Sequence, residues 1–263
     1  MRGKSVVVTG AASGIGEAVA LRCAQLAASV AVLDICLDKA LTVAEEVQRA
    51  GAPRSVGIEC DVSSEASVEA AFEHASQAIG AFDAVFANAG IEVNGPLHHF
   101  ELELWRRVLD VNLTGVFLTC RQALTDFVER GAPGSIVCTS SPAAFVGFSG
   151  GGNSAYAASK GGVSAFVRSA ALDYAPRGIR VNAVVPGATE TAMLVAGISE
   201  QSRPQEFRKI RSAAAEQIPL GRLAKPDEVA SAVVWLLSDD SSYVTGTNLV
   251  CDGGLMAKSA NDF

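Results

Sequence analysis

Tyr156 and Lys160 are the two residues whose types and spacing most directly suggest chemistry. They lie four positions apart in Tyr156-Ala-Ala-Ser-Lys160, so on a helix they would share a face. A free tyrosine has a pKa of about 10 and is a poor base at neutral pH. A neighbouring lysine ammonium favours the phenolate and should lower the pKa of the tyrosine. The pair is therefore a candidate for proton exchange with a substrate hydroxyl or carbonyl, although a surface pair on a helix has the same spacing.

A glycine-rich turn near the N-terminus suggests a phosphate-bearing ligand. The apolar run Ser5–Thr9 leads into glycines at positions 10, 14 and 16, and a helical pattern follows over Gly14–Ala28. Glycines allow a tight turn and close approach of a pyrophosphate, which the positive end of the following helix attracts. An ordinary strand-to-helix turn is the alternative. The residues of this turn expected to bind the cofactor are Gly10, Ser13, Gly14, Ile15 and Gly16.

Two carboxylates follow the next two strands and indicate which dinucleotide is bound. Asp34 ends the second strand, where a carboxylate accepts hydrogen bonds from ribose hydroxyls and repels a 2′-phosphate. Neither Ser13 nor Ile35 is basic, so we predict NAD rather than NADP; a surface aspartate that caps the next helix is the alternative. After the third strand, Asp61 is expected near the adenine amino group and Val62 against the ring. A plain helix-capping turn explains these two residues nearly as well.

The elements that must position these residues alternate between short apolar runs and longer helical patterns. The runs are continuously apolar, which suits strands covered on both faces, and the alternation predicts a doubly wound (Rossmann-type) parallel sheet. We expect a single α/β domain over residues 1–263, with about seven strands and helices on both faces. The expected strands are Ser5–Thr9, Val30–Asp34, Ser55–Glu59, Ala84–Ala87, Ser135–Thr139, Arg180–Val185 and Asn248–Cys251. The expected helices are Gly14–Ala28, Leu37–Ala50, Glu65–Ile79, Leu104–Arg130, Ala155–Ala175 and Asp227–Leu237.

Residues 189–217 do not follow this alternation. They are rich in Ala, Ser, Glu and Arg and contain Gly197 and Pro204. We expect this segment to be an irregular, mobile lid over the substrate.

Taken together and in this order, the motifs resemble those of the short-chain dehydrogenase/reductase family. The match extends from Val6 to Gly254. The motifs that carry it are Thr9–Gly16, Asp61, Ala87-Asn-Ala-Gly90, Asp110-Val-Asn-Leu-Thr-Gly115, Ser140-Ser141, Tyr156–Lys160, Pro186-Gly187, Val244-Thr-Gly246 and Asp252-Gly-Gly254.

The resemblance implies a role for each matching residue. Tyr156 is the implied general acid/base, and Lys160 is implied to lower its pKa and to hold the nicotinamide ribose. Asn112 is implied to anchor a water in a proton relay, and within the expected long helix its side chain has no other evident task. The further residues implied to form the cofactor cleft or to border the nicotinamide are Asn88, Ala89, Gly90, Pro186, Gly187, Thr189 and Thr191.

A serine is also implied, to orient the substrate oxygen. Ser141 matches best, but it lies 15 positions before Tyr156 (156 − 141), two more than is usual in the family. A loop insertion within 147–153 explains the extra length, because loop-closure entropy grows slowly with loop length. Ser140 remains the alternative.

Composition narrows the possible partners. The formal net charge is −7, and the absence of a basic block argues against nucleic acid. The six cysteines show no metal-ligand spacing and suggest reduced thiols and no metal site. We find no run long enough for a membrane span or a signal peptide and expect a cytoplasmic protein. By resemblance we expect a homotetramer that pairs the helices Leu104–Arg130 and Ala155–Ala175; light scattering from a monomer would contradict this.

The sequence therefore predicts hydride transfer between NAD(H) and a small-molecule secondary alcohol or ketone. Two alternatives remain: an NADPH-dependent 3-oxoacyl-type ketoreductase, and a non-catalytic dinucleotide-binding sensor or scaffold. A moderately apolar substrate is expected. The residues predicted to line its pocket are Val93, Leu97, Ala143, Phe145, Phe148, Met193 and Leu194.

Overall fold

The computed structural model describes residues 1–148, 152–195 and 199–258, and its centre is one parallel seven-stranded sheet. The strand order is β3-β2-β1-β4-β5-β6-β7, which confirms the predicted doubly wound fold. The strands are β1 (Ser5–Thr9), β2 (Ser29–Asp34), β3 (Ser55–Glu59), β4 (Ala84–Ala87), β5 (Gly134–Thr139), β6 (Ile179–Pro186) and β7 (Asn248–Cys251).

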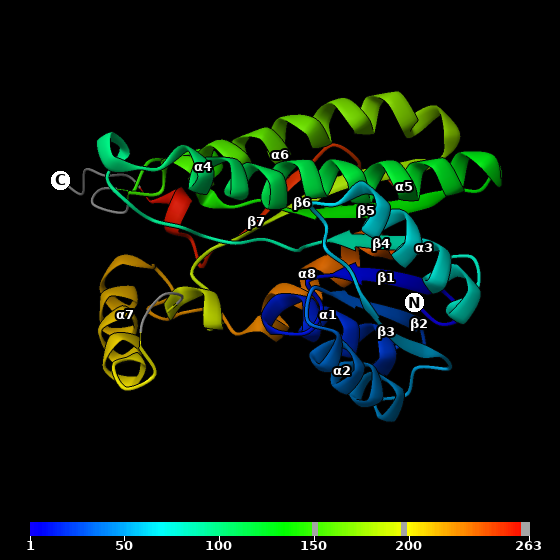
Figure 1. Cartoon of the computed structure of the whole chain (residues 1–263), viewed down its shortest axis with the longest axis horizontal. Helices are drawn as coiled ribbons and strands as arrows, with labels where there is room; N and C mark the ends of the chain where they lie inside the picture. The colour runs from blue at the N-terminus through cyan, green and yellow to red at the C-terminus, as the bar shows by residue number, and fades with distance from the viewer. Residues whose placement is uncertain (149–151, 196–198, 259–263) are drawn as a thin grey trace.

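Helices cover both faces of the sheet (Figure 1). One layer contains α1 (Gly14–Gln25), α2 (Leu37–Arg49) and α8 (Pro226–Leu237). The other layer contains α3 (Glu65–Ile79), α5 (Gly115–Glu129) and α6 (Ser154–Tyr174), with α4 (Leu102–Leu109) leading into α5. A further helix, α7 (Arg203–Gln217), lies apart from both layers in Figure 1.

The continuous apolar strands have the burial that the sequence predicts. Val6, Val7 and Val8 on β1 are all fully buried. Because successive side chains of a strand point to opposite faces, Val7 packs in the core under α3, α5 and α6, while Val6 and Val8 pack in the core under α1, α2 and α8. A strand that is buried on both faces has apolar side chains at every position, so its sequence does not alternate between apolar and polar residues.

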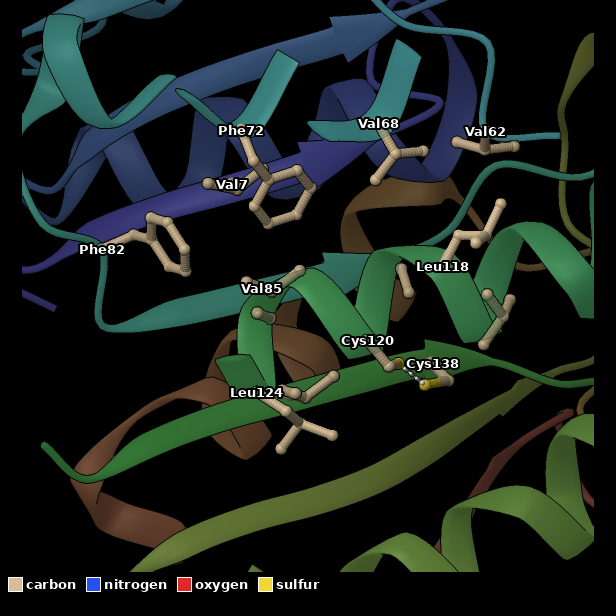
Figure 2. Packing of buried hydrophobic residues seen from close by; sticks show 14 of the residues in the cluster. Val7, Val62, Val68, Phe72, Phe82, Val85, Leu118, Cys120, Leu124 and Cys138 are labelled. Atoms are coloured by element: carbon tan, nitrogen blue, oxygen red, sulfur yellow. Dashed lines mark hydrogen bonds between the residues drawn. The ribbon is translucent and has the colours of Figure 1, made fainter. Parts of the chain in front are cut away.

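The first of these cores is filled by aromatic rings and thiols as well as aliphatic side chains (Figure 2). The rings of Phe72 and Phe82 meet edge to face with centroids 5.5 Å apart, and Phe82 meets Phe127 at 5.6 Å. Cys120 on α5 points at Cys138 on β5, with the two sulfur atoms 3.6 Å apart. All six cysteines are free thiols, as predicted for reduced cysteines.

Two expected elements differ in the structure. The helix predicted over Leu104–Arg130 is interrupted, because a π-helical segment occupies Asp110–Thr114 between α4 and α5. The expectation of an irregular segment over 189–217 is wrong for its second half, where α7 forms. Pro204 stands in the first turn of α7. Backbone N–H groups in a first helical turn have no partner within the helix, so the N–H that proline lacks costs nothing there. Residues 196–198 of that segment lie outside the described residues, as do residues 149–151 of the predicted insertion.

The topology places a crevice at one edge of the sheet. From β1 the chain runs outward to β2 and β3, then crosses back to β4 on the other side of β1 and continues outward to β7. The loops that follow β1 and β4 therefore diverge, and ligands of doubly wound sheets bind in the resulting crevice.

Candidate functional site

A cavity of about 900 Å³ lies at the carboxyl ends of the strands. This volume lies within the range of small-molecule and cofactor sites. It brings together every predicted site residue except Gly16 and Asn112. Those at its wall are Gly10, Ser13, Gly14, Ile15, Asp34, Ile35, Asp61, Val62, Asn88, Ala89, Gly90, Ser141, Tyr156, Lys160, Pro186, Gly187, Thr189 and Thr191.

The glycine turn after β1 leaves no room for side chains. Gly10 has φ +59°, and a Cβ there would lie 2.8 Å from the Cα of Ala89. A Cβ on Gly16 would collide with the carbonyl oxygen of Gly10. The turn thus presents bare backbone at the start of α1, which is the environment that a pyrophosphate requires.

Asn88 joins the ends of three strands beneath the cavity. Its amide nitrogen donates to the carbonyl oxygens of Thr9 (3.2 Å) and Gly10 (3.1 Å) after β1. Its side-chain oxygen accepts from the hydroxyl of Thr139 at the end of β5, at 3.0 Å. Asn88 therefore fixes the shape of the floor, consistent with the role that the sequence predicts for it.

The Asp34 carboxylate lies at the far end of the cavity, beside the glycine turn. It accepts hydrogen bonds from the backbone N–H groups of Ala12 (3.0 Å) and Cys36 (3.1 Å). These bonds fix the carboxylate at the cavity wall, and each oxygen keeps a further lone pair for a ligand hydroxyl. The neighbouring wall residues Ser13 and Ile35 are exposed and uncharged. This environment fits the ribose of a dinucleotide.

Asp61 and Val62 line the same end of the cavity. One Asp61 oxygen accepts from both the backbone N–H (2.9 Å) and the hydroxyl (2.6 Å) of Ser63. This is the local turn that the alternative interpretation predicts, and it coexists with a place on the cavity wall. Contact of these residues with adenine remains a prediction.

Tyr156, Lys160 and Ser141 meet at the opposite end of the cavity. The Ser141 hydroxyl lies close enough to the Tyr156 phenol to act on its pKa, and the Lys160 nitrogen lies 5.5 Å from the centroid of the tyrosine ring. Lys160 also donates to the carbonyl oxygen of Thr139 at 2.8 Å. By contrast, the Ser140 hydroxyl is buried against α6, 2.7 Å from that of Ser164. The geometry therefore favours Ser141 over Ser140.

The electrostatics of this trio correct one expectation. Burial raises the pKa of Tyr156 to about 12, the Ser141 hydroxyl acts to lower it, and the negative charge of Glu92 raises it. Burial also lowers the pKa of Lys160 to about 8. The sequence predicted that Lys160 lowers the pKa of Tyr156, but desolvation of the phenolate is the largest influence on that pKa and the net shift is upward. In the protein alone, Tyr156 is a neutral phenol that is ready to donate a proton.

Asn112 has a task that the sequence did not reveal. Its side-chain oxygen accepts from the backbone N–H of Ile91 at 2.8 Å, and its amide nitrogen donates to the Ile91 carbonyl oxygen at 2.8 Å and to the Ser159 hydroxyl at 3.2 Å. Asn112 is fully buried within the π-helical segment, and such segments are frequent at functional sites. The expectation that its side chain has no other evident task is therefore wrong: Asn112 ties the loop after β4 to the helical layer.

Comparison with known proteins agrees with this geometry. A family model described as "Enoyl-(Acyl carrier protein) reductase" matches residues 10–256. The chain belongs to the short-chain dehydrogenase/reductase family. Members of this family are oxidoreductases that use a nicotinamide dinucleotide, and the curated relatives that match include hydroxysteroid and glucose dehydrogenases.

Three relatives illustrate the range of this family. The chain is 43% identical to cis-4-hydroxycyclohexanecarboxylate dehydrogenase of Sinomonas cyclohexanicum, over 95% of this chain and 96% of that one. It is 39% identical to 3beta-hydroxysteroid dehydrogenase 1 of Eggerthella lenta, over 97% and 94%. A solved 3-oxoacyl-[acyl-carrier protein] reductase of Brucella melitensis with bound NAD has a TM-score of 0.85 at 35% identity, over 97% and 91%.

The cavity also contains polar residues that no motif indicated. They are Glu92, Asn94, Glu103, Arg107 and Asn153. Their available signal was position alone: Glu92 and Asn94 come just after Asn88-Ala-Gly90, and Asn153 comes just before Tyr156.

The predicted apolar lining is correct only in part. Ala143, Phe148, Met193 and Leu194 line the cavity, whereas Val93, Leu97 and Phe145 do not. Leu97 and Phe145 are instead largely exposed.

No group of metal-ligating side chains occurs within residues 1–148, 152–195 and 199–258. Over the same residues, no helix combines the length and apolar character needed to span a membrane.

The Asn112 contacts predict a stability effect that is independent of catalysis. Asn112→Ala should lower the free energy of unfolding by about 1–3 kcal/mol, because two part-buried backbone groups of Ile91 lose their partner. Asn94→Ala, an exposed change on the same loop, is the control and should shift stability by no more than about 0.5 kcal/mol. Chemical denaturation measures both, and equal stability of the two variants would contradict this role of Asn112.

Proposed function

We propose that this protein is an NAD(H)-dependent oxidoreductase that interconverts a secondary alcohol and its ketone, with Tyr156 as general acid/base. The observation that supports this most directly is the meeting of Ser141, Tyr156 and Lys160 at one end of a cavity whose other end holds the glycine turn and Asp34. A single continuous cavity lets one dinucleotide reach from Asp34 to the tyrosine.

The proton and the substrate oxygen are handled by three side chains. In ketone reduction, the neutral Tyr156 phenol donates its proton to the carbonyl oxygen while Ser141 donates a second hydrogen bond to the same oxygen. Lys160, held by the Thr139 carbonyl, stabilises the negative charge that develops on the phenol oxygen. Alcohol oxidation runs these steps backwards. When bound, the nicotinamide supplies or accepts the hydride.

The remaining predicted residues have proposed roles in holding the cofactor. Gly10, Gly14 and the start of α1 receive the pyrophosphate, and Asp34 binds the adenosine ribose. Asn112 acts by fixing the loop that carries Glu92, and a water held by Asn112 remains a proposal. Pro186, Gly187, Thr189 and Thr191 line the same cavity, and the Thr191 side chain lies against Gly14 of the glycine turn.

We also propose that the segment 189–217 acts as a lid over the substrate. Met193 and Leu194, in a single helical turn after β6, reach the cavity wall. The helix α7 that follows packs on a small apolar cluster of its own around Ala214, Ile218 and Leu223. Because this cluster is separate from the two main cores, the segment can move without disturbing them.

The alternatives receive less support. An NADPH-dependent 3-oxoacyl-type reductase would bind the 2′-phosphate of its cofactor better with a basic residue nearby. The cavity wall at that end contains Asp34, Ser13 and Ile35 instead, and none of these is basic. The likeness to an NAD-bound structure of that class keeps the substrate question open but is compatible with NAD. A non-catalytic sensor has no use for a buried lysine beside a buried phenol.

The catalytic proposal is tested by removing one oxygen atom. Tyr156→Phe keeps the ring and should lower kcat for a secondary alcohol by about 10²–10⁴-fold, because the proton donor and acceptor is lost. Tyr174→Phe on the same helix is the matched control and should retain normal turnover. Cofactor binding, followed by nucleotide fluorescence, should persist in both variants. Turnover of Tyr156→Phe within about tenfold of wild type would rule out the general-acid/base role.

Cofactor choice is tested at Asp34. Wild type should use NAD with a kcat/KM at least about tenfold above that for NADP, because the carboxylate repels the 2′-phosphate. Asp34→Ala should narrow this ratio by losing NAD efficiency, while Asp38→Ala, an exposed change in the first turn of α2, should leave the ratio unchanged. A wild-type preference for NADP would refute the assignment of NAD.

The pKa directions predict opposite pH dependences for the two reaction directions. Oxidation needs the Tyr156 phenolate beside a charged Lys160. Because burial raises the pKa of Tyr156 to about 12 and lowers that of Lys160 to about 8, kcat/KM for the alcohol should rise with pH from 6 to about 8 and then level off. Reduction needs the phenol, which stays protonated over that range, and a charged Lys160, whose pKa of about 8 makes kcat/KM for the ketone fall above that pH. Initial rates at saturating cofactor give both profiles; an oxidation rate that falls with rising pH would contradict the scheme.

A further inference from the structure

Glu92 is a carboxylate on the cavity wall with no hydrogen-bond or ion-pair partner among the described residues. Its side chain is partly buried and lines the cavity together with Tyr156 and Ser141. Within the described ranges, no residue donates a hydrogen bond to it or forms an ion pair with it. Because no described protein group occupies its hydrogen-bonding positions, the carboxylate is available to accept a hydrogen bond from a ligand in the cavity.

Asn153 is a second polar group of the same kind. It stands immediately before α6 at the N-cap position, but its side chain makes no capping hydrogen bond. Among the residues that the structure describes, none forms a hydrogen bond with the Asn153 side chain. Asn153 also lines the cavity. Glu92 offers acceptors only, whereas the Asn153 amide offers both donors and an acceptor.

Backbone hydrogen bonds fix the two segments that carry Glu92 and Asn153. Asn112 binds both backbone groups of Ile91, next to Glu92. The backbone N–H of Gly95 donates to the carbonyl oxygen of Gly152, next to Asn153, at 2.9 Å. The loop after β4 is thus fixed on both sides of Glu92 and joined to the segment that carries Asn153. Glu92 lies close enough to the reacting end that its charge raises the pKa of both Tyr156 and Lys160.

We infer that Glu92 and Asn153 form a subsite for a second hydroxyl of the substrate, so that the protein acts on neutral diols or polyols in preference to simple alcohols. This inference rests on the proposed alcohol dehydrogenase function. A hydroxyl donates to the Glu92 carboxylate and accepts from the Asn153 amide, which satisfies both side chains at once. A substrate anion is repelled by Glu92, and a substrate ammonium is repelled by Lys160 in the same cavity.

The test compares two alcohols that differ by one hydroxyl. Initial rates with NAD are measured for cis-cyclohexane-1,2-diol and for cyclohexanol, using wild type and Glu92→Gln. The substitution keeps the shape of the side chain but removes its charge. Wild type should prefer the diol, and kcat/KM of Glu92→Gln for the diol should fall by about tenfold, because the Gln amide oxygen still accepts a hydrogen bond but lacks the charge that strengthens it. Asn153→Ala should lower the same constant in the same direction.

The result for cyclohexanol separates recognition from a structural role. Cyclohexanol does not occupy the subsite, and loss of the negative charge favours the Tyr156 phenolate, so its oxidation by Glu92→Gln should stay within about threefold of wild type or rise. Glu101→Gln, an exposed carboxylate at the start of α4 and outside the cavity, is the matched control and should alter neither substrate.

Two outcomes contradict different parts of the argument. If Glu92→Gln lowers kcat/KM for both alcohols by the same factor, or if wild type prefers cyclohexanol, the proposal of a hydroxyl subsite is wrong. The proposed dehydrogenase function is unaffected by either result. If wild type oxidises neither alcohol with NAD or NADP, and reduces neither cyclohexanone nor 2-hydroxycyclohexanone with the reduced cofactors, the proposed function itself is wrong.

Discussion

A chain of hydrogen bonds across the strand ends connects the two halves of the site. The carbonyl oxygens of Thr9 and Gly10 accept from Asn88, Asn88 accepts from Thr139, and the Thr139 carbonyl accepts from Lys160. These residues come from the ends of β1, β4 and β5 and from α6. Parallel strands are joined by their own ladders only as far as their last paired residues, so beyond that point side chains must fix the spacing. Asn88 and Lys160 do so here, and the distance from the glycine turn to Tyr156 depends on them.

A second set of bonds fixes the wall above this floor. Asn112, in its π-helical segment, holds Ile91, and the Gly95–Gly152 bond extends the restraint to the segment before α6. The π-helical segment matters because an extra residue in the helical turn changes the direction of the side chains that follow it. The fold thus uses one irregularity in a long helix to place a single amide where it can bind the backbone of a distant loop.

Much of this architecture could be predicted because its signals are local. Ser55–Glu59, Glu65–Ile79 and Ala84–Ala87 have the same bounds in the sequence prediction and in the structure, since apolar runs and helical periodicity identify them directly. The break at Asp110–Thr114 was missed because its apolar pattern continues that of the flanking helices. The helix α7 was missed because Pro204 suggested irregular chain, although proline is favoured in a first helical turn.

The parts of the site that could not be predicted depend on contacts between distant residues. The bonds of Asn112 to Ile91 span 21 positions, and no periodicity reveals them. The raised pKa of Tyr156 reflects burial by several elements together, so the lysine four positions away was a poor guide to it. Glu92 and Asn153 carry no motif, and only the folded chain shows that they share a cavity.

The floor of the cavity is fixed by hydrogen bonds between strand ends, whereas much of its wall comes from loops. This difference affects which substitutions the fold can accept. The proposed proton transfer depends on α6 and the ends of β4 and β5. Much of the rest of the cavity wall comes from loop residues, which are Ile91, Glu92, Asn94, Asn153, Ala188, Thr189, Thr191, Ala192, Met193 and Leu194. Substitutions in those wall segments alter the shape and polarity offered to a substrate while the Asn88–Thr139–Lys160 connection stays intact. Exchange of short segments can therefore alter the substrate while the residues proposed to carry the hydride and proton chemistry stay in place.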